Sequence, residues 1–343
     1  MSLRLRTLLF LLGAALLTMV VAQVGVNVLI EQVRALSWQL PLLLIPYVFV
    51  TLLDTLGWKY AFGAQAATVR FGPLLASRIA GEAVNLTTPS ASLAGEPIKA
   101  YLLQRWIPLD EGIASVVIAK TIITLAQIPF AVSGVALIVF VLALPPTMLW
   151  SLVVTLIVGT VATLALYRLQ LRGMFRWLLG VLDRLRCCPA FLDTRRPQLL
   201  VLDRRIARFY RSHPREFGLS FAFHLLGWVT QSLEVYFALW LLGFSVTVAD
   251  AIAIEVLASV LKSVAFMVPG NLGVQEGGNV VIFAAFGLGA GTGLTFSLVR
   301  RLRELLFCGL GWLILLLLAP GASTSLASSG TEGKGEGPTG ESP

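Results

Sequence analysis

Residues 121–167 read TIITLAQIPFAVSGVALIVFVLALPPTMLWSLVVTLIVGTVATLALY and contain no Asp, Glu, Lys or Arg. An α-helix needs about 20 apolar residues to cross the hydrocarbon core of a bilayer. This run therefore holds most of one spanning helix and all of a second, with a turn at Pro145-Pro146. It predicts that the chain lies in a membrane.

The rest of the chain supports the same interpretation. Residues 7–30, 35–53, 277–299 and 305–331 also lack charged side chains. Over 343 residues, 57% are hydrophobic and 13% are charged, and the mean hydropathy is +0.85. An ordinary soluble domain carries about 25% charged residues, so the composition excludes one. The first apolar run reaches Ile30, beyond the about 7–15 residues of a signal-peptide core, and predicts a retained helix.

These runs and their breaks predict an all-α polytopic membrane protein with about six spanning helices and two broken, re-entrant hairpins. The hairpin breaks are expected at Pro89 and at Pro269, Gly270 and Gly273, where a simple extramembrane turn is the alternative. Residues 1–318 form the membrane domain, and the Gly- and Ser-rich residues 319–343 form a disordered tail. The expected helices are 7–29, 38–60, 72–88, 92–107, 112–143, 147–167, 218–243, 250–267, 274–288 and 292–318.

A basic loop joins the two parts of this domain. Residues 168–216 contain twelve Arg and three Asp. The positive-inside rule places this loop, and Arg4 and Arg6, in the cytoplasm. We therefore expect a bacterial inner-membrane protein with cytoplasmic N- and C-termini. Residues 197–212 mix apolar and Arg positions at helical spacing, which predicts an interfacial helix on an anionic lipid surface rather than a nucleic-acid site.

Two halves, 38–140 and 218–320, repeat the same sparse polar residues at a shift of 180 positions. The predicted topology sends helix 38–60 inward and helix 218–243 outward, so the repeat is inverted, as in many secondary transporters. Coincidence among few charges is the alternative. The shift aligns Asp54 with Glu234, Pro89 with Pro269, Glu96 with Glu276, Lys120 with Arg300, and Glu82 with Lys262, the last pair having opposite charges.

Charged residues at bilayer depth carry the predicted chemistry. Each costs about 2.5–3.5 kcal/mol at a helix centre, so six facing lipid would cost about 15–20 kcal/mol, above the usual net stability of about 5–15 kcal/mol. We expect them to pair, Glu96 with Lys120 and Glu276 with Arg300 or Arg301. We hypothesise that Lys120, Arg300 and Arg301 also meet a lipid head group; purely structural ion pairs are the alternative. The candidate binding residues are Asp54, Glu82, Glu96, Lys120, Glu234, Lys262, Glu276, Arg300 and Arg301.

Known catalytic motifs are missing from the sequence. A P-loop, a nucleophile elbow, HExxH and CxxC are all absent, so ATP-driven transport and hydrolase chemistry lack support. We predict no catalytic residue, metal ligand or cofactor, and interpret His213 and His224 as structural. A lipid translocator is favoured because of the repeat. An intramembrane transferase using Glu96 or Glu276, and a non-catalytic partner of a lipid-synthesis complex, are the alternatives.

The segment Pro269-Gly-Asn-Leu-Gly-Val-Gln-Glu276 resembles the Pro-Gly-Gly-Leu-Gly-x-x-Glu stretch of the transmembrane-region family of lysylphosphatidylglycerol synthases, with Asn271 in place of a glycine. Arg301 followed by Gly309 and Gly311 is similar too, as is Gly81-Glu82…Asn85…Pro89…Gly95-Glu96, and the likeness covers roughly residues 5–318. The resemblance implies a flippase-like domain for polar or charged lipids, with a link to hopanoid or aminoacyl-phospholipid metabolism. Aminoacyl transfer is not expected, because the chain contains no soluble synthase domain.

Overall fold

The computed structural model describes residues 40–88, 93–142, 145–185, 189–264 and 273–318. Within these ranges the regular secondary structure is α-helical, apart from a short 3₁₀ helix, η2 (Gly63–Ala67). The expectation of an all-α chain is confirmed there. The predicted helix 7–29, the predicted tail 319–343 and the break residues Pro89, Pro269 and Gly270 lie outside the described residues.

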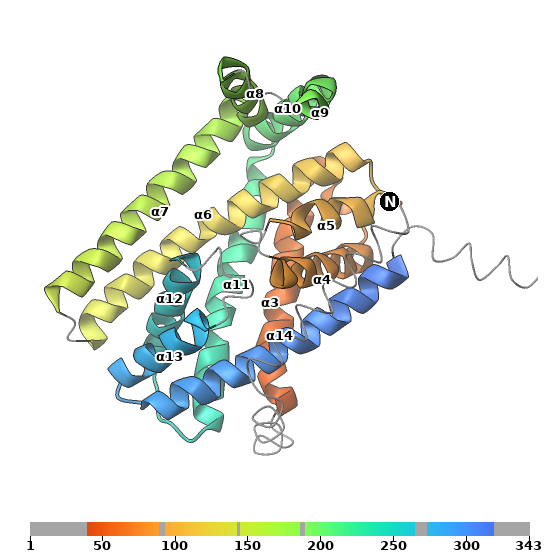
Figure 1. Ribbon diagram of the computed structural model, residues 1–343. Coiled ribbons are helices and arrows are strands. Elements are labelled where there is room, and N and C mark those ends of the chain that lie inside the picture. Colours follow the sequence, from red (N-terminus) through yellow and green to blue (C-terminus); the bar gives the residue numbers. More distant parts are fainter. Residues whose placement is uncertain (1–39, 89–92, 143–144, 186–188, 265–272, 319–343) are drawn as a thin grey trace, which may run out of the picture.

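Four helices make up the first half. They are α3 (Leu40–Tyr60), α4 (Phe71–Thr87), α5 (Gly95–Leu103) and α6 (Leu109–Val141). Asp110 and Glu111 lie in the first turn of α6, where carboxylates stabilise the positive end of the helix dipole. The 33 residues of α6 extend over about 50 Å at 1.5 Å per residue. This helix crosses the molecule diagonally (Figure 1).

The second half repeats this order. It consists of α11 (Pro214–Leu241), α12 (Val248–Val264), α13 (Val274–Ala285) and α14 (Ala290–Leu318). A shift of 180 residues superimposes their ranges on those of α3, α4, α5 and α6, in that order. The repeat seen in the sparse charges is thus also a repeat of helices.

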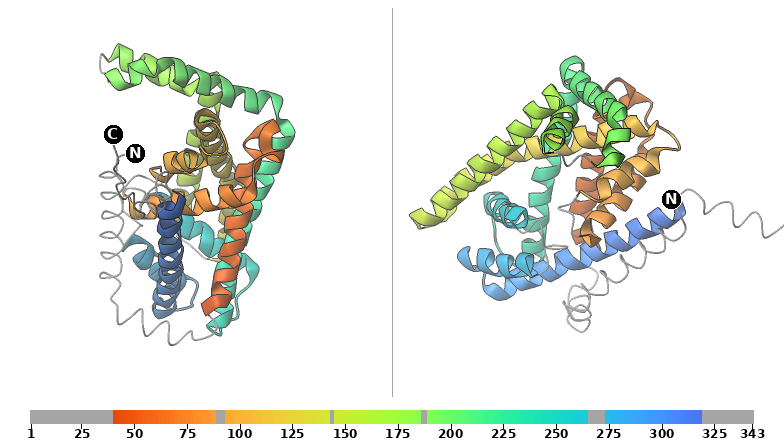
Figure 2. Two further views of the ribbon diagram at one scale, coloured as in Figure 1. Left: turned by 90° about the vertical axis from the view of Figure 1, so that its right-hand side faces the viewer. Right: turned by 45° about the horizontal axis from the view of Figure 1, so that its top comes forward.

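Corresponding helices run in opposite directions. Ser220 Oγ donates to Gly57 O at 2.8 Å, and His224 contacts Asp54, so residue numbers rise along α3 as they fall along α11. The long helices α6 and α14 also run in opposite directions (Figures 1 and 2). Helices of one half pack against helices of the other, α4 against α14 and α12 against α6. The two halves therefore share one interior.

The basic segment between the halves forms a layer at one end of the molecule (Figure 1). It follows α7 (Pro146–Arg172) and consists of α8 (Met174–Arg184), α9 (Ala190–Thr194) and α10 (Arg196–Ser212), the predicted interfacial helix. Asp203 of α10 accepts from the N–H groups of Phe175 and Arg176 at 3.0 and 2.7 Å and caps α8. Arg205 contacts Asp110 and Glu111 at 2.6 and 2.9 Å, which fastens α10 to the start of α6.

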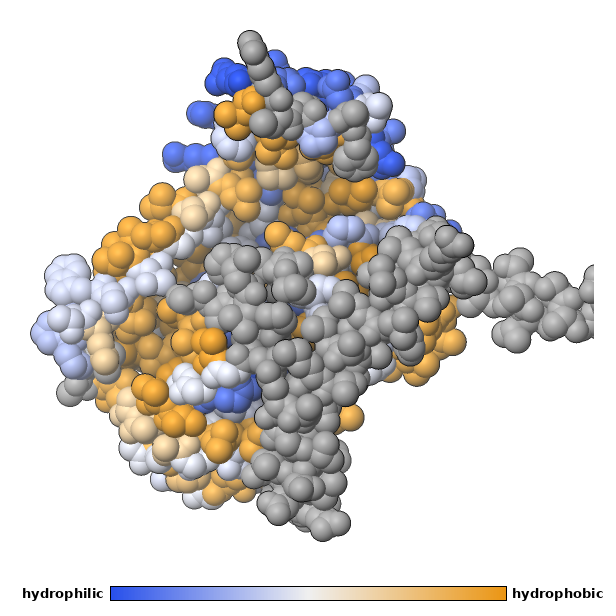
Figure 3. All heavy atoms as spheres, viewed as in Figure 1, coloured by the Kyte–Doolittle hydropathy of each residue, from blue (hydrophilic) through white to orange (hydrophobic). Residues whose placement is uncertain are grey.

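The exterior matches a membrane environment along α7. Only α6 and α7, among the described helices, are long and apolar enough to cross a bilayer, and just 6% of the apolar stretch of α7 is buried. Trp150, Val158 and Val161 are each at least 60% exposed. Hydrophobic residues cover much of the visible flank, whereas the layer formed by α8–α10 is hydrophilic (Figure 3). Fewer helices than the predicted six pass this test, in part because α14 carries four charged residues.

Candidate functional site

A cavity of about 510 Å³ lies between the two halves. Helices α3, α4 and α6 line it from the first half, and α11, α12 and α14 line it from the second. We call it the central cavity. Three aromatic side chains, Tyr47, Trp228 and Phe307, contribute to its wall. Its charged lining residues are Asp54, Arg78, Glu82, Lys120, Glu255, Lys262, Arg303 and Glu304.

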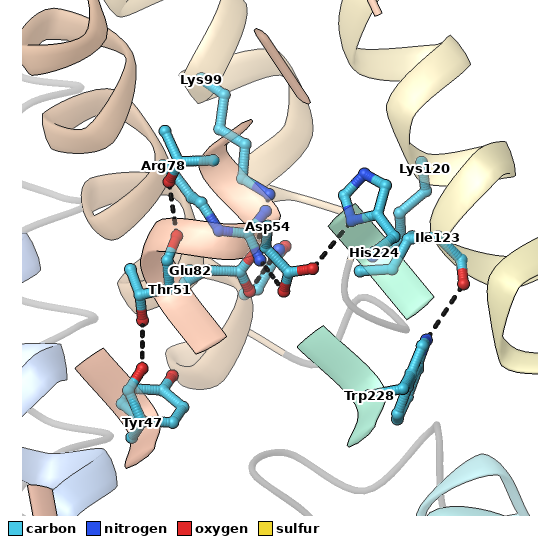
Figure 4. Close-up of polar contacts among 12 residues, drawn as sticks. Tyr47, Thr51, Asp54, Arg78, Glu82, Lys99, Lys120, Ile123, His224 and Trp228 are labelled. Carbon is cyan, nitrogen blue, oxygen red and sulfur yellow. Dashed lines mark hydrogen bonds and ion pairs between the residues drawn. The ribbon is translucent and has the colours of Figure 1, made fainter. Parts of the chain in front are cut away.

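Asp54 links the two halves at one end of the charged wall. One carboxylate oxygen accepts from Arg78 of α4 at 2.7 Å, and the other lies 2.8 Å from Nδ1 of His224 on α11. Figure 4 shows the carboxylate between these two partners. A Cβ added to Gly227 would lie 2.9 Å from Asp54 Oδ1, so glycine leaves room for this contact. His224, interpreted from the sequence as structural, thus contacts one of the predicted binding residues.

A second cluster, built by α4, α5 and α6, surrounds Lys99. The Lys99 ammonium contacts Glu82 at 2.7 Å and Glu96 at 2.9 Å, and Lys120 contacts the same oxygen of Glu96 at 3.4 Å. Asn85 donates to that Glu96 oxygen at 3.2 Å and accepts from the Gly95 N–H at 2.7 Å. The pairing predicted between Glu96 and Lys120 is present.

Small residues bring α4 and α5 close enough for these contacts. A Cβ built on Gly95 would lie 1.9 Å from the carbonyl oxygen of Gly81, which no side chain can accommodate. Gly81 in turn faces Lys99, whose Cγ would lie 2.4 Å from an added Cβ. The glycines named in the family resemblance therefore have a packing role beside the carboxylates.

The second half holds three cations of α14 against carboxylates. Arg300 binds Glu255 of α12 at 2.5 Å, with Glu234 of α11 at 3.7 Å. Arg303 contacts Glu234 closely and lies over the ring of Tyr47, with 4.0 Å between its guanidinium carbon and the ring centroid. A ring face attracts a cation in this position. Glu304 binds Arg301 at 2.8 Å.

Glu276 joins the start of α13 to α14. Gly273 has a φ of +76° and donates its N–H to Glu276 Oε2 at 2.7 Å, while Oε1 binds Arg301 at 2.5 Å. Of the predicted pairings for Glu276, the one with Arg301 is present, and Arg300 binds elsewhere. Gly273 is the described member of the predicted break, and its positive φ explains why glycine occupies it.

The structure divides the nine predicted binding residues into two groups. Asp54, Glu82, Lys120 and Lys262 line the central cavity. The other five, Glu96, Glu234, Glu276, Arg300 and Arg301, do not line it. Carboxylates bind both Arg300 and Arg301, whose side chains are 0% and 1% exposed, and that either arginine also meets a head group stays a hypothesis.

Five further residues complete the site. Arg78, Lys99 and Glu255 were missed as candidates, whereas Arg303 and Glu304 are neighbours of predicted residues along α14. Lys99 follows Glu96 by three residues and Arg78 precedes Glu82 by four, spacings at which side chains meet on one helix face. That signal was available in the sequence. No feature of the sequence indicates that Glu255 faces Arg300.

Known proteins are similar to this chain along most of its length. The family model described as "Lysylphosphatidylglycerol synthase TM region" matches residues 6–311, which include the first half, most of the second half and the residues that line the central cavity. A UPF0104 membrane protein of Methanothermobacter thermautotrophicus is 24% identical over 304 residues, which is 86% of this chain and 90% of that protein. No solved structure matches the chain.

Proposed function

Since this chain belongs to the lysylphosphatidylglycerol synthase TM region family, and is thus a membrane protein, we propose that it translocates a lipid whose polar or charged head group binds in the central cavity. The family resemblance suggests a link to hopanoid or aminoacyl-phospholipid metabolism. We also propose that the chain lies in the bacterial inner membrane with its N- and C-termini in the cytoplasm.

One observation carries the proposal: eight charged side chains from both halves line a cavity in a chain whose helix α7 is apolar and exposed. Taking a charge out of water costs several kcal/mol, and buried ion pairs recover this only with good geometry and further hydrogen bonds. Charged residues that line a cavity are therefore not expected to stabilise the fold, because their desolvation costs free energy. They are expected where the cavity must replace the water around a polar head group.

The helix lengths support an inverted arrangement with re-entrant hairpins. At 1.5 Å per residue, the 9 residues of α5 and the 12 residues of α13 reach about 14 and 18 Å, short of the about 30 Å hydrocarbon core. Such short helices occur inside a membrane where protein or a cavity covers their ends. With α3 opposed to α11, and α6 to α14, one half can rock against the other and open the cavity alternately to each side.

The geometry favours transport over the alternative of a transferase. A general base must lie within hydrogen-bonding reach of its substrate. Glu96 and Glu276, the carboxylates suggested for such a role, do not line the central cavity and are bound by cations. The alternative of a scaffold for a lipid-synthesis complex would use α8–α10 and has no need of the cavity.

Reconstituted vesicles separate these functions. The purified chain is inserted into vesicles containing acyl-labelled lipids, and both leaflet distribution and lipid mass are followed. Redistribution without mass change supports a translocator, a mass change supports a transferase, and binding only through residues 168–216 supports a scaffold.

A steric variant tests whether the cavity is the route. Thr124→Trp places an indole into the cavity wall and should reduce translocation at least tenfold. The same substitution at Thr155, on the exposed surface of α7, is the matched control and should leave the rate unchanged. Equal rates for the two variants would exclude the cavity as the route.

A further inference from the structure

Glu82 and Lys262 occupy equivalent positions of the two halves, on α4 and α12, but their charges are opposite. Both line the central cavity. At the other three pairs of equivalent charged positions, the two residues have the same sign, and each forms an ion pair within the protein. The one pair of equivalent positions with opposite charges, Glu82 and Lys262, therefore faces the cavity in which a head group would lie.

Lys262 is the cation of this wall that has no partner among the described residues. Arg78 is bound by Asp54, Lys120 by Glu96 and Arg303 by Glu234. No hydrogen bond or ion pair joins Lys262 to any part of the chain that the structure describes. An ammonium group offers three donors and a point charge, which suits a phosphate oxygen.

Glu82 is the most accessible carboxylate of the wall. Its side chain is 40% exposed, compared with 9% for Asp54, 13% for Glu304 and 0% for Glu255. Lys99 binds its Oε1 at 2.7 Å, whereas among the described residues the one hydrogen bond to Oε2 is a long contact of 3.4 Å from Asn85. An ionised carboxylate accepts more bonds than these, so Oε2 can accept from a second cation.

The lining charges balance. Four cations, Arg78, Lys120, Lys262 and Arg303, stand beside four anions, Asp54, Glu82, Glu255 and Glu304. A head group with a net charge of either sign would leave an excess charge in a site of low dielectric constant, where uncompensated charge is costly. A head group that carries both signs and no net charge leaves the site neutral.

We propose, on the basis of the proposed function, that the central cavity takes a zwitterionic phospholipid head group, with the phosphate at Lys262 and the ammonium at Glu82. Charge-assisted hydrogen bonds hold each end. A head group with one charged end only would make just one of these two contacts.

Binding and translocation are measured on the same full-length protein. Native mass spectrometry compares retention of phosphatidylethanolamine, phosphatidylglycerol and a diacyl trimethylammonium lipid with matched acyl chains, and vesicles report the movement of acyl-labelled forms. Wild type should favour the zwitterion at least tenfold in both assays. Lys262→Gln should remove the preference over the cationic lipid, and Lys262→Arg should restore it. Glu82→Gln should remove the preference over phosphatidylglycerol.

The outcomes separate the two proposals. Equal retention of all three lipids by the wild type, or an unchanged preference in Lys262→Gln, overturns the zwitterion assignment even if lipids move. Selective retention without movement overturns translocation and keeps the assignment. Lys262→Gln breaks no described contact, so its folding should match wild type. Competition by glycerophosphoethanolamine, which lacks acyl chains, as strong as that by the intact lipid would assign the site to a soluble ligand and overturn the lipid assignment.

Discussion

Replacing Arg300 with Met is expected to lower the free energy of unfolding by about 3–5 kcal/mol, because it strips a buried carboxylate of its main partner. Arg300 and Glu255 lie 2.5 Å apart, and both side chains are 0% exposed. The Gln231 amide, which donates to Glu255 at 2.8 Å, cannot compensate the charge. Glu234 would still be bound by Arg303.

The double variant distinguishes the cost of an unpaired charge from general loss of packing. In Glu255→Leu/Arg300→Met both charges are gone, and apolar pairs of similar volume are often as stable as the buried ion pair that they replace. The double variant should therefore recover most of the loss seen in Arg300→Met. Two residues in direct contact are expected to show this kind of coupling.

Unfolding in mixed micelles, followed by tryptophan fluorescence, measures these differences. Arg208→Met on α10 is the matched control, since this exposed arginine lies outside the cavity and should change stability by no more than about 0.5 kcal/mol. A loss below about 1 kcal/mol in Arg300→Met, or a double variant as unstable as the sum of the single ones, would show that Arg300 does not offset the buried charge of Glu255.

Three further predictions concern packing, capping and pH. Gly95→Ala should cost about 1–3 kcal/mol, measured as above, and weaken lipid retention, because α4 and α5 must separate to admit the methyl group. Asp203→Ala should cost about 1 kcal/mol and speed hydrogen exchange at the start of α8, whose N–H groups it caps; Asp203→Asn should keep much of the protection. In the basic layer, hydrogen bonds from Arg196 hold the pKa of Asp183 below its ordinary value. This contact therefore stabilises the layer above that ordinary value and is lost as pH falls through the lowered pKa, which an NMR titration of the carboxyl group would detect and Arg196→Gln should abolish.

The helices were predictable because apolar runs and breaks define them locally. The predicted helix 197–212 is found at Arg196–Ser212, and the predicted piece 72–88 at Phe71–Thr87. The 180-residue shift also anticipates the correspondence of α4 with α12 and of α6 with α14. These features depend on residues near one another in the chain.

The pairing of charges across helices was less predictable. Arg300 and Arg301 are adjacent in sequence but point about 100° apart around α14, so one faces Glu255 and the other Glu276. Asp54 and His224 meet across 170 positions. Helix α4 packs against α14 of the opposite half. Neither the spacing of residues nor the repeat predicts such contacts between helices of different halves.

Alternating access requires that the central cavity can be reached from each side of the membrane in turn. Thr124→Cys, in a chain whose native Cys187, Cys188 and Cys308 are replaced by Ser, is treated with a membrane-impermeant thiol reagent from either side of oriented vesicles. We expect labelling from both sides and protection by bound lipid, with Thr155→Cys on the apolar face of α7 unreactive from both. Labelling of Thr124→Cys from one side alone, with or without lipid, would contradict alternating access through this cavity.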